Sequence, residues 1–204
     1  MRRLITGMTL LACGILFTAC GRAPQKEGMY LKRAELTQEE ENIAKLLGGQ
    51  QDIYDFKVDD TVRALEINIY RLSDGEWRLF SGGRQQMEDE EGRIALAFDD
   101  LAEGLRVSVQ SEGVSGSSSY TTEPEEKEEG CCCTTARLEE LSAVTYEEEI
   151  PLLVQIFTQK DTVYSYQVDY FFKPEEYEKH GYETVYAVTV KFSQNPLQDE
   201  TADF

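Results

Sequence analysis

The residues with the most unusual chemistry in this chain are three consecutive cysteines, Cys131, Cys132 and Cys133. Cysteine thiolates bind soft metals such as Cu(I) and Zn and hold iron–sulfur clusters, so the triplet is a candidate metal-binding or redox site. Its spacing differs from that of closed metal sites, because adjacent side chains of an extended segment point to opposite faces. An incidental loop sequence is the alternative interpretation.

The motifs that assemble a catalytic centre are missing from the sequence. His180 is the only histidine, and no Gly-x-Ser-x-Gly segment supplies a nucleophile for a triad built on it. We expect His180 to lie exposed in a turn. The carboxylate pairs Asp59-Asp60 and Asp99-Asp100 offer oxygen ligands for calcium, but neither has the alternating frame of an EF-hand loop. We therefore predict a protein without catalytic residues and without a bound cofactor.

A row of tyrosines in the last quarter of the chain is a candidate binding surface. Tyr164, Tyr166 and Tyr170 recur at a period of two with Phe172, which predicts one face of a long strand. Tyrosine combines apolar area with a polar tip, so such a stripe can stack on sugars or bury itself against a protein partner. The alternative is a sheet face covered by the core of the same domain.

The first twenty residues carry a signal of a different kind. Arg2-Arg3 precede an apolar run over residues 4–17, and Thr18-Ala19-Cys20 follow it. A basic start, a short apolar core and small residues before the cut are typical of a secretory signal peptide. The apolar run is shorter than the roughly 18 residues that a membrane-spanning helix needs. We predict that residues 1–19 are a signal peptide.

With cysteine at the first mature position, residues 17–20 resemble the lipobox of bacterial lipoproteins. That resemblance implies a diacylglyceryl thioether and a further acyl chain such as palmitate on Cys20. It also implies attachment of the mature chain to the extracytoplasmic face of the cell membrane. Cys13 is a rival lipidation site, with an aliphatic Leu10 three residues before it, but an apolar stretch follows it. Because polar chain follows Cys20 at once, we predict Cys20.

The net charge limits the class of partner, and the cysteine count limits the possible disulfides. The chain has 39 acidic and 20 basic residues, and loss of Arg2 and Arg3 with the signal peptide leaves 18 basic residues and a net charge of −21. Nucleic-acid binding needs Lys and Arg to neutralise phosphates, so this balance argues against a nucleic-acid partner. If Cys13 is removed and Cys20 carries lipid, the three remaining cysteines are an odd number, which excludes a spaced disulfide framework.

Hydrophobic patterning divides the mature chain into a tether and one domain. Residues 20–36 lack a sustained apolar period and predict a lipidated tether. Thr37 and Glu40 form a capping-box pattern that begins a short amphipathic helix, which Gly48-Gly49 ends. We expect this helix to cover a core. Residues 37–193 are predicted to form a single mainly-β domain, followed by a polar tail over residues 194–204.

Alternation with a period of two predicts the strands of this domain. They are expected at residues 53–58, 65–70, 76–80, 93–98, 105–109, 150–158, 164–172 and 186–192. Asp74-Gly75 predicts a tight hairpin, Ser81-Gly82-Gly83 the end of the next strand, and residues 174–181 a helical turn. Two successive hairpins suggest an antiparallel meander, and residues 111–136 are predicted to form a flexible acidic loop.

These elements predict an antiparallel β-sandwich or partly closed barrel with one short N-terminal helix. The alternative is an α+β layer in which the helix covers one sheet face. The functional prediction is a membrane-anchored extracytoplasmic lipoprotein with a non-catalytic binding or assembly domain. Its partners would be the membrane, through the lipid, and an unidentified protein or carbohydrate ligand. The alternative is a metal-binding or redox lipoprotein that uses Cys131, Cys132 and Cys133.

Overall fold

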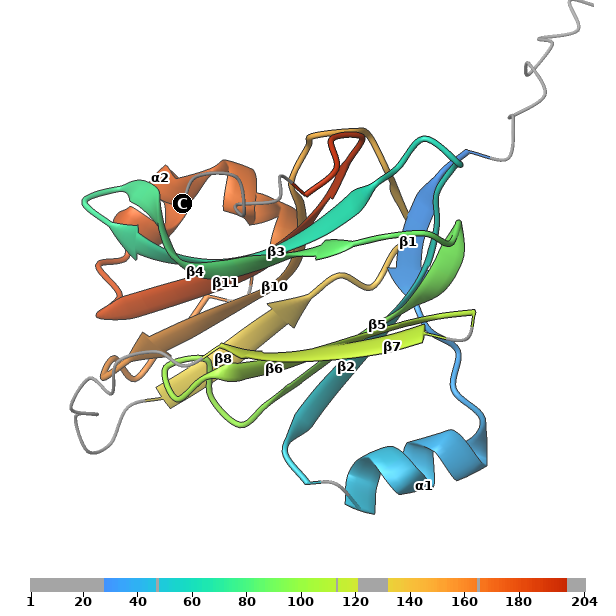
Figure 1. Ribbon diagram of the computed structural model, residues 1–204. Helices are drawn as coiled ribbons and strands as arrows, with labels where there is room; N and C mark the ends of the chain where they lie inside the picture. Colours follow the sequence, from blue (N-terminus) through green and yellow to red (C-terminus); the bar gives the residue numbers. More distant parts are fainter. Residues whose placement is uncertain (1–27, 47, 113, 121–131, 165, 198–204) are drawn as a thin grey trace, which may run out of the picture.

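The computed structural model describes residues 28–46, 48–112, 114–120, 132–164 and 166–197, and these form two antiparallel sheets (Figure 1). The strands are β1 (Tyr30–Arg33), β2 (Gln50–Lys57), β3 (Ala64–Ser73), β4 (Glu76–Gln86), β5 (Glu91–Phe98), β6 (Leu105–Ser111), β7 (Val114–Tyr120), β8 (Cys132–Arg137), β9 (Ser142–Ala143), β10 (Ile150–Thr158) and β11 (Thr184–Ser193). The helices are α1 (Gln38–Leu46), the 3₁₀ helix η1 (Val168–Phe172) and α2 (Pro174–Glu178). The prediction of a mainly-β fold is confirmed.

The six-stranded sheet has the order β7-β6-β5-β2-β1-β9, and the five-stranded sheet has the order β4-β3-β11-β10-β8. In the described part of the chain neither sheet closes on itself. Apolar side chains from both sheets meet in one core: the rings of Phe56 on β2 and Phe192 on β11 lie 5.6 Å apart. The Tyr54 hydroxyl on β2 donates to the Leu152 carbonyl on β10 at 3.0 Å, which joins the two sheets by a buried hydrogen bond.

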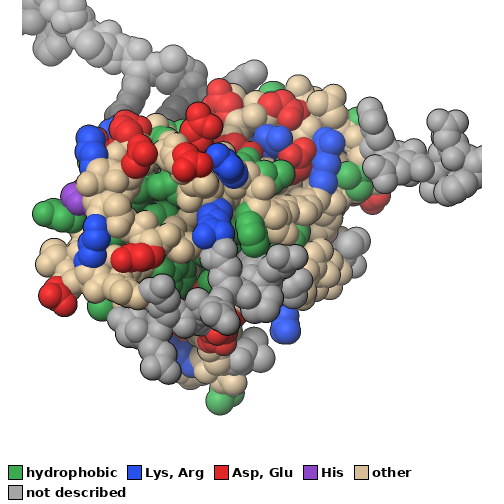
Figure 2. Space-filling view, turned by 90° about the vertical axis from the view of Figure 1, so that its left-hand side faces the viewer, with side chains coloured by type: hydrophobic (Ala, Val, Ile, Leu, Met, Phe, Trp, Pro, Cys, Tyr) green, Lys and Arg blue, Asp and Glu red, His purple; other side chains and the backbone are tan. Residues whose placement is uncertain are grey.

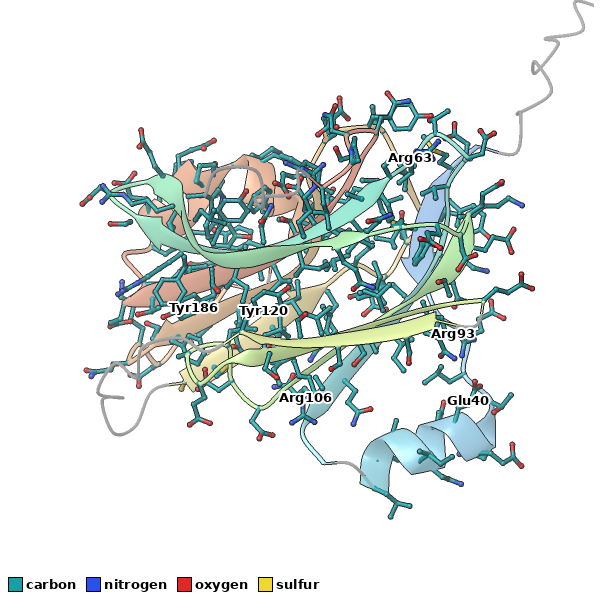
Figure 3. All side chains as sticks on the ribbon, viewed as in Figure 1. Glu40, Arg63, Arg93, Arg106, Tyr120 and Tyr186 are labelled. Atoms are coloured by element: carbon teal, nitrogen blue, oxygen red, sulfur yellow. The ribbon has the colours of Figure 1, made fainter. Side chains whose placement is uncertain are left out.

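The predicted capping box of α1 is confirmed. The Thr37 amide donates to Glu40 Oε2 at 2.7 Å, and the Glu40 amide donates to Thr37 Oγ1 at 3.3 Å. The expectation that this helix covers a core is wrong, because none of its residues is buried and Leu46 is 86% exposed. Polar contacts hold α1 instead: Glu40 accepts from Arg93 on β5 at 2.9 Å, and the two side chains point toward each other in Figure 3.

Acid is expected to melt α1 selectively. The hydrogen bond from the Thr37 amide, together with Arg93, lowers the pKa of Glu40 from 4.5 to about 2. A lowered carboxyl pKa contributes stability above the unfolded-state value and loses it as the pH falls through the folded-state value. The helical Cα chemical shifts of α1 should therefore decay between pH 4.5 and about 2 while those of β10 persist. Glu40→Gln should remove most of this pH dependence, Glu39→Gln should leave it, and unchanged α1 shifts at pH 2 would contradict the expectation.

The hairpin at Asp74-Gly75 is confirmed, with φ of 54° and 74° at the two turn residues. The predicted meander is wrong, because β3 and β4 pair in the five-stranded sheet whereas β5 and β6 pair in the six-stranded sheet. The expectation that β4 ends near residue 83 is also wrong, since the strand continues to Gln86. A Cβ on Gly83 would lie 2.5 Å from the Tyr120 hydroxyl. The glycine therefore allows close packing between the sheets and does not end the strand.

Two segments predicted to be irregular contain strands. Within the predicted tether, residues 30–33 form β1, which pairs with β2 and β9 and buries Leu31 completely. The predicted flexible loop contains two edge strands: β7 forms one edge of the six-stranded sheet, and β8 forms one edge of the five-stranded sheet. Partners distant in the sequence supply the backbone hydrogen bonds in each case, so local composition was a poor guide. The acidic residues 121–131 and the lipidated end of the tether lie outside the described residues.

The two strands predicted near 150–158 and 186–192 are confirmed as β10 and β11, which lie inside the five-stranded sheet. Both are buried over almost their whole length. The sheet face that points away from the other sheet is covered by η1 and α2 (Figure 1) and by the segment with Glu147 and Glu149, which bind Ser193 and Thr189 of β11. The predicted long strand over residues 164–172 is wrong: η1 occupies residues 168–172. Phe171 anchors η1 by stacking on Trp77 at 5.2 Å, and the Trp77 indole N–H donates to the Phe171 carbonyl at 2.7 Å.

The described part of the polar tail is exposed, and Gln194 donates to Thr61 Oγ1 at 2.8 Å. The helical turn predicted at 174–181 is confirmed as α2, with Pro174 at its first turn.

A membrane span would need a helix of greater length and apolarity than any in the described residues. The N-terminal apolar run lies outside that range, so the signal-peptide prediction is not tested by the fold.

Candidate functional site

The predicted tyrosine row does not line a strand, but the structure brings its members to one end of the domain. Tyr170 lies in η1, and its ring is 4.6 Å from that of Tyr166, which precedes the helix. Tyr164 stacks on His180 at 4.3 Å, and Tyr166 lies 6.0 Å from the same imidazole. His180 is therefore the hub that joins residues 164–170 to the turn after α2. It was expected to be exposed, but it is half-buried between rings.

We define the aromatic cluster by six side chains that contact one another around His180. They are Tyr164, Tyr166, Tyr170, Tyr177, His180 and Tyr182. Its outer part is a column of three nearly parallel rings. Tyr164 and His180 are inclined by 30°, and His180 and Tyr182 lie 5.5 Å apart at 25°. The Tyr164 amide donates to the Tyr182 hydroxyl at 3.0 Å, which fixes the two ends of the column relative to each other.

The inner part of the cluster belongs to the domain core. Tyr177 is 1% exposed and meets Tyr166 edge to face at 5.1 Å. Burial raises the pKa of both tyrosines, so their hydroxyls stay protonated. The sequence left two alternatives for the tyrosines, a binding face or a covered sheet face. The cluster has both characters, since Tyr177 is buried and Tyr164 is 55% exposed.

Two lysines lie beside rings of the aromatic cluster. The Lys173 ammonium lies 4.8 Å from the centre of the Tyr170 ring, and Lys160 lies 5.9 Å from that of Tyr182. Lys160 also donates to the His180 carbonyl. Hydrogen bonding by Thr158 lowers the pKa of Glu183, which therefore stays ionised beside Lys160. In the view of Figure 2 the purple side chain of the only histidine lies among Lys, Arg and hydrophobic side chains.

A hollow of about 510 Å³ adjoins the column and shares Tyr182 with it. Its lining residues are Arg71, Leu72, Ser73, Asp74, Arg78, Leu79, Phe80, Tyr182 and Glu183. Arg71 on β3 and Arg78 on β4 face each other across the hairpin. Asp74 in the turn accepts from Arg78 at 2.8 Å and so orients its guanidinium. Leu79 is 62% exposed at the rim.

The described cysteines are not gathered into one site. Cys132 and Cys133 occupy consecutive positions of β8, and both are exposed. Consecutive strand positions point to opposite faces, so the geometric objection raised by the sequence applies to this pair. Cys131 and Cys20 lie outside the described residues. Among the residues that the structure describes, no group of three or more His, Cys, Asp or Glu side chains is arranged to hold a metal ion.

The paired carboxylates considered for calcium have structural roles. Asp59 accepts from the Thr61 amide at 3.0 Å and from the hydroxyl of Tyr146, which lowers the pKa of Asp59. Asp100 accepts from the Ala102 amide at 2.7 Å. Such contacts to the backbone two residues ahead are typical of Asx turns.

Sequence reasoning missed His180, Lys160 and the hairpin arginines as parts of a site. Tyr177, Tyr182 and Tyr186 follow the tyrosine row in the sequence, and composition alone made them candidates for the same surface. Of these, Tyr186 lies between the sheets instead, where its ring meets that of Phe80 edge to face at 5.8 Å (Figure 3). Which tyrosines reach the surface depends on where η1 and α2 lie on the sheet.

Comparisons with known proteins were made at three levels. No protein-family model matches the chain, no curated protein matches it, and no solved structure matches it. The role of the aromatic cluster is therefore interpreted from its own residues and their geometry.

Proposed function

We propose that the chain is a lipid-anchored extracytoplasmic protein whose sandwich-like β domain recognises a ligand through the aromatic cluster and catalyses no reaction. The anchor is supported by the lipobox resemblance at Cys20, which lies outside the described residues. A short tether before β1 would hold the domain at the membrane surface. The ligand would be a protein or a carbohydrate in the extracytoplasmic space.

The observation that carries the recognition part of this proposal is the ring column of Tyr164, His180 and Tyr182. Ligand-binding faces use large, rigid side chains whose position is set before the ligand arrives, because this lowers the entropy lost on binding. The column has this property: a hydrogen bond joins Tyr164 to Tyr182, and the imidazole separates their rings. Tyr164 still exposes 55% of its surface, so it is both fixed and accessible.

The anchor can be tested with the full-length chain in a bacterial host that processes lipoproteins. Growth with an alkyne analogue of palmitate should label the wild type. Cys20→Ser should lose the label completely and leave the membrane fraction, because the thioether cannot form on a hydroxyl. Cys13→Ser is the matched control and should keep the label. Label that is lost from Cys13→Ser but kept by Cys20→Ser would place the anchor at the rival site, and no label on the wild type would reject the anchor.

The recognition face can be tested with the lipidated protein in detergent. Binding to isolated cell envelopes should be weakened at least about fivefold by Tyr164→Ala, since removal of an aromatic anchor from a binding face costs more than about 1 kcal/mol. Leu141→Ala is the control, because Leu141 is an apolar side chain that is 61% exposed outside the cluster. Equal binding by the wild type and Tyr164→Ala would remove the cluster as the binding face.

A further inference from the structure

We propose that the hollow beside Tyr182 is a binding subsite for a neutral oligosaccharide. This inference rests on the proposed function, in which the same end of the domain is the ligand-binding face. It adds the class of ligand and the residues that would recognise it. The inference rests on the combination of an aromatic ring with paired guanidinium and carboxylate groups in one hollow.

Tyr182 supplies the platform. One face of its ring is stacked on His180, and the ring also lines the hollow. The apolar C–H face of a pyranose ring packs on tyrosine through the same contacts that aromatic side chains make with one another. A sugar in the hollow would contact the Tyr182 ring beside the Lys160 ammonium, which lies 5.9 Å from the ring centre. Because the ring column is already formed, little side-chain entropy would be lost on binding.

The hydrogen-bonding groups of the hollow match a hydroxyl-rich ligand. Each sugar hydroxyl both donates and accepts, and adjacent hydroxyls suit the two-pronged geometry of guanidinium and carboxylate groups. Arg71 and Arg78 supply donors from opposite strands, and Asp74 and Glu183 supply acceptors. The contact of 2.8 Å between Asp74 and Arg78 positions both groups before a ligand arrives.

Charge selects a neutral saccharide over an acidic one. The lining has two arginines and two carboxylates, so its formal charges cancel. Without the predicted signal peptide the chain carries a net charge of −21 (18 basic and 39 acidic residues), which repels anionic polymers at long range. The volume of about 510 Å³ lies within the range of about 300–1,000 Å³ that is typical of small-ligand sites.

A protein ligand fits the hollow less well than a saccharide. Protein-binding hot spots are aromatic or arginine side chains in well-packed, desolvated surroundings, with few other charges at the centre. Here four charged side chains line one hollow, and Leu79 is the exposed apolar group at its rim. Burying this lining against a protein would remove water from all four charges at once. A sugar can replace that water with hydroxyl groups.

The test uses the full lipidated protein in detergent and native affinity electrophoresis in gels that contain one soluble polysaccharide. The probes are the neutral polymers β-glucan, mannan and xylan and the anionic polymer polygalacturonate. At least one neutral polymer should retard the wild type, and polygalacturonate should not. Arg78→Ala and Tyr182→Ala should each raise the apparent Kd at least about tenfold, the factor that corresponds to about 1.4 kcal/mol.

Two controls separate recognition from folding. Tyr182→Phe keeps the ring and should keep at least half of the retardation. Arg106→Ala removes an exposed arginine of β6, a strand of the other sheet (Figure 3), and should change nothing because Arg106 does not line the hollow. Retardation that survives Arg78→Ala and Tyr182→Ala would overturn the assignment of the hollow, as would a preference for polygalacturonate.

If none of the polymers retards the protein, the saccharide inference is overturned. The proposed function can still stand in that case, because it is tested separately by envelope binding and its loss in Tyr164→Ala. Envelope binding that protease treatment of the envelopes destroys would then identify a protein ligand. If no polymer retards the protein and Tyr164→Ala does not weaken envelope binding, both the saccharide inference and the recognition face are rejected.

Discussion

Replacing Arg137 with methionine is expected to lower the free energy of unfolding by about 3–5 kcal/mol, because it leaves a buried carboxylate without its main partner. Asp52 on β2 is 1% exposed and points between the sheets. The Arg137 Nε on β8 donates to both of its carboxylate oxygens, at 3.0 and 2.9 Å. Arg33 also contacts this carboxylate, at 3.4 Å, but the contact is longer than those of Arg137 and the Arg33 side chain is 40% exposed, so it compensates only in part. The interaction joins an edge strand of one sheet to the interior of the other.

Two variants identify the cause of this loss. The double variant Asp52→Leu with Arg137→Met should recover most of the stability, because an apolar pair of similar volume needs no compensating charge. Arg78→Met removes the partner of Asp74, but that pair is 62% and 81% exposed. Its loss should cost less than about 1 kcal/mol. Urea unfolding followed by circular dichroism measures all three, and a loss below about 1 kcal/mol for Arg137→Met would contradict a buried ion pair.

Replacing Tyr54 with alanine is expected to cost about 3–5 kcal/mol, the usual range for removing a large buried aromatic side chain. Tyr54 is fully buried between the sheets, and its hydroxyl donates to the Leu152 carbonyl at 3.0 Å. Burial raises the pKa of this tyrosine above its ordinary value, so the hydroxyl stays protonated and remains a donor at neutral pH. The substitution opens a cavity at the centre of the core and removes a hydrogen bond between the sheets.

Tyr54→Phe separates the two contributions. It removes the hydrogen bond and keeps the ring, so the expected loss is about 1 kcal/mol. The Leu152 carbonyl also accepts from the Leu138 amide at 2.8 Å and therefore keeps a partner in this variant. Urea unfolding measures both changes, because a lower midpoint with an unchanged m-value reports a loss of stability. If Tyr54→Phe costs as much as Tyr54→Ala, the hydrogen bond rather than packing dominates, contrary to this expectation.

Most strands could be predicted because their side chains alternate in a way that survives any tertiary arrangement. The patterns around Tyr54, Ile67 and Leu96 each place apolar groups on one face, and each strand was found. Strands β1, β7 and β8 were missed because they are polar, short or at a sheet edge. Their backbone hydrogen bonds come from residues far along the chain, as where Cys133 of β8 pairs with Phe157 of β10.

The site was predicted in part, for a related reason. Tyr164, Tyr166 and Tyr170 were selected because tyrosine suits recognition wherever the chain places it. Their assignment to a strand was wrong because a period of two over nine residues is also compatible with an irregular segment and a short 3₁₀ helix. His180 could not be assigned from its neighbours, since its ring partners come from both sides of α2.

The sequence alone determined the mainly-β class, the capping box of α1 and the Asp74-Gly75 hairpin. Each depends on residues within a few positions of one another, so local chemistry is sufficient. The lipid on Cys20 stays a prediction from the sequence. Only the tertiary structure decided which hairpin enters which sheet, which tyrosines are buried, and that His180 joins Tyr164 to Tyr182 beside a charged hollow. These features depend on contacts between distant segments, and the free energy of those contacts comes from burial in a shared core.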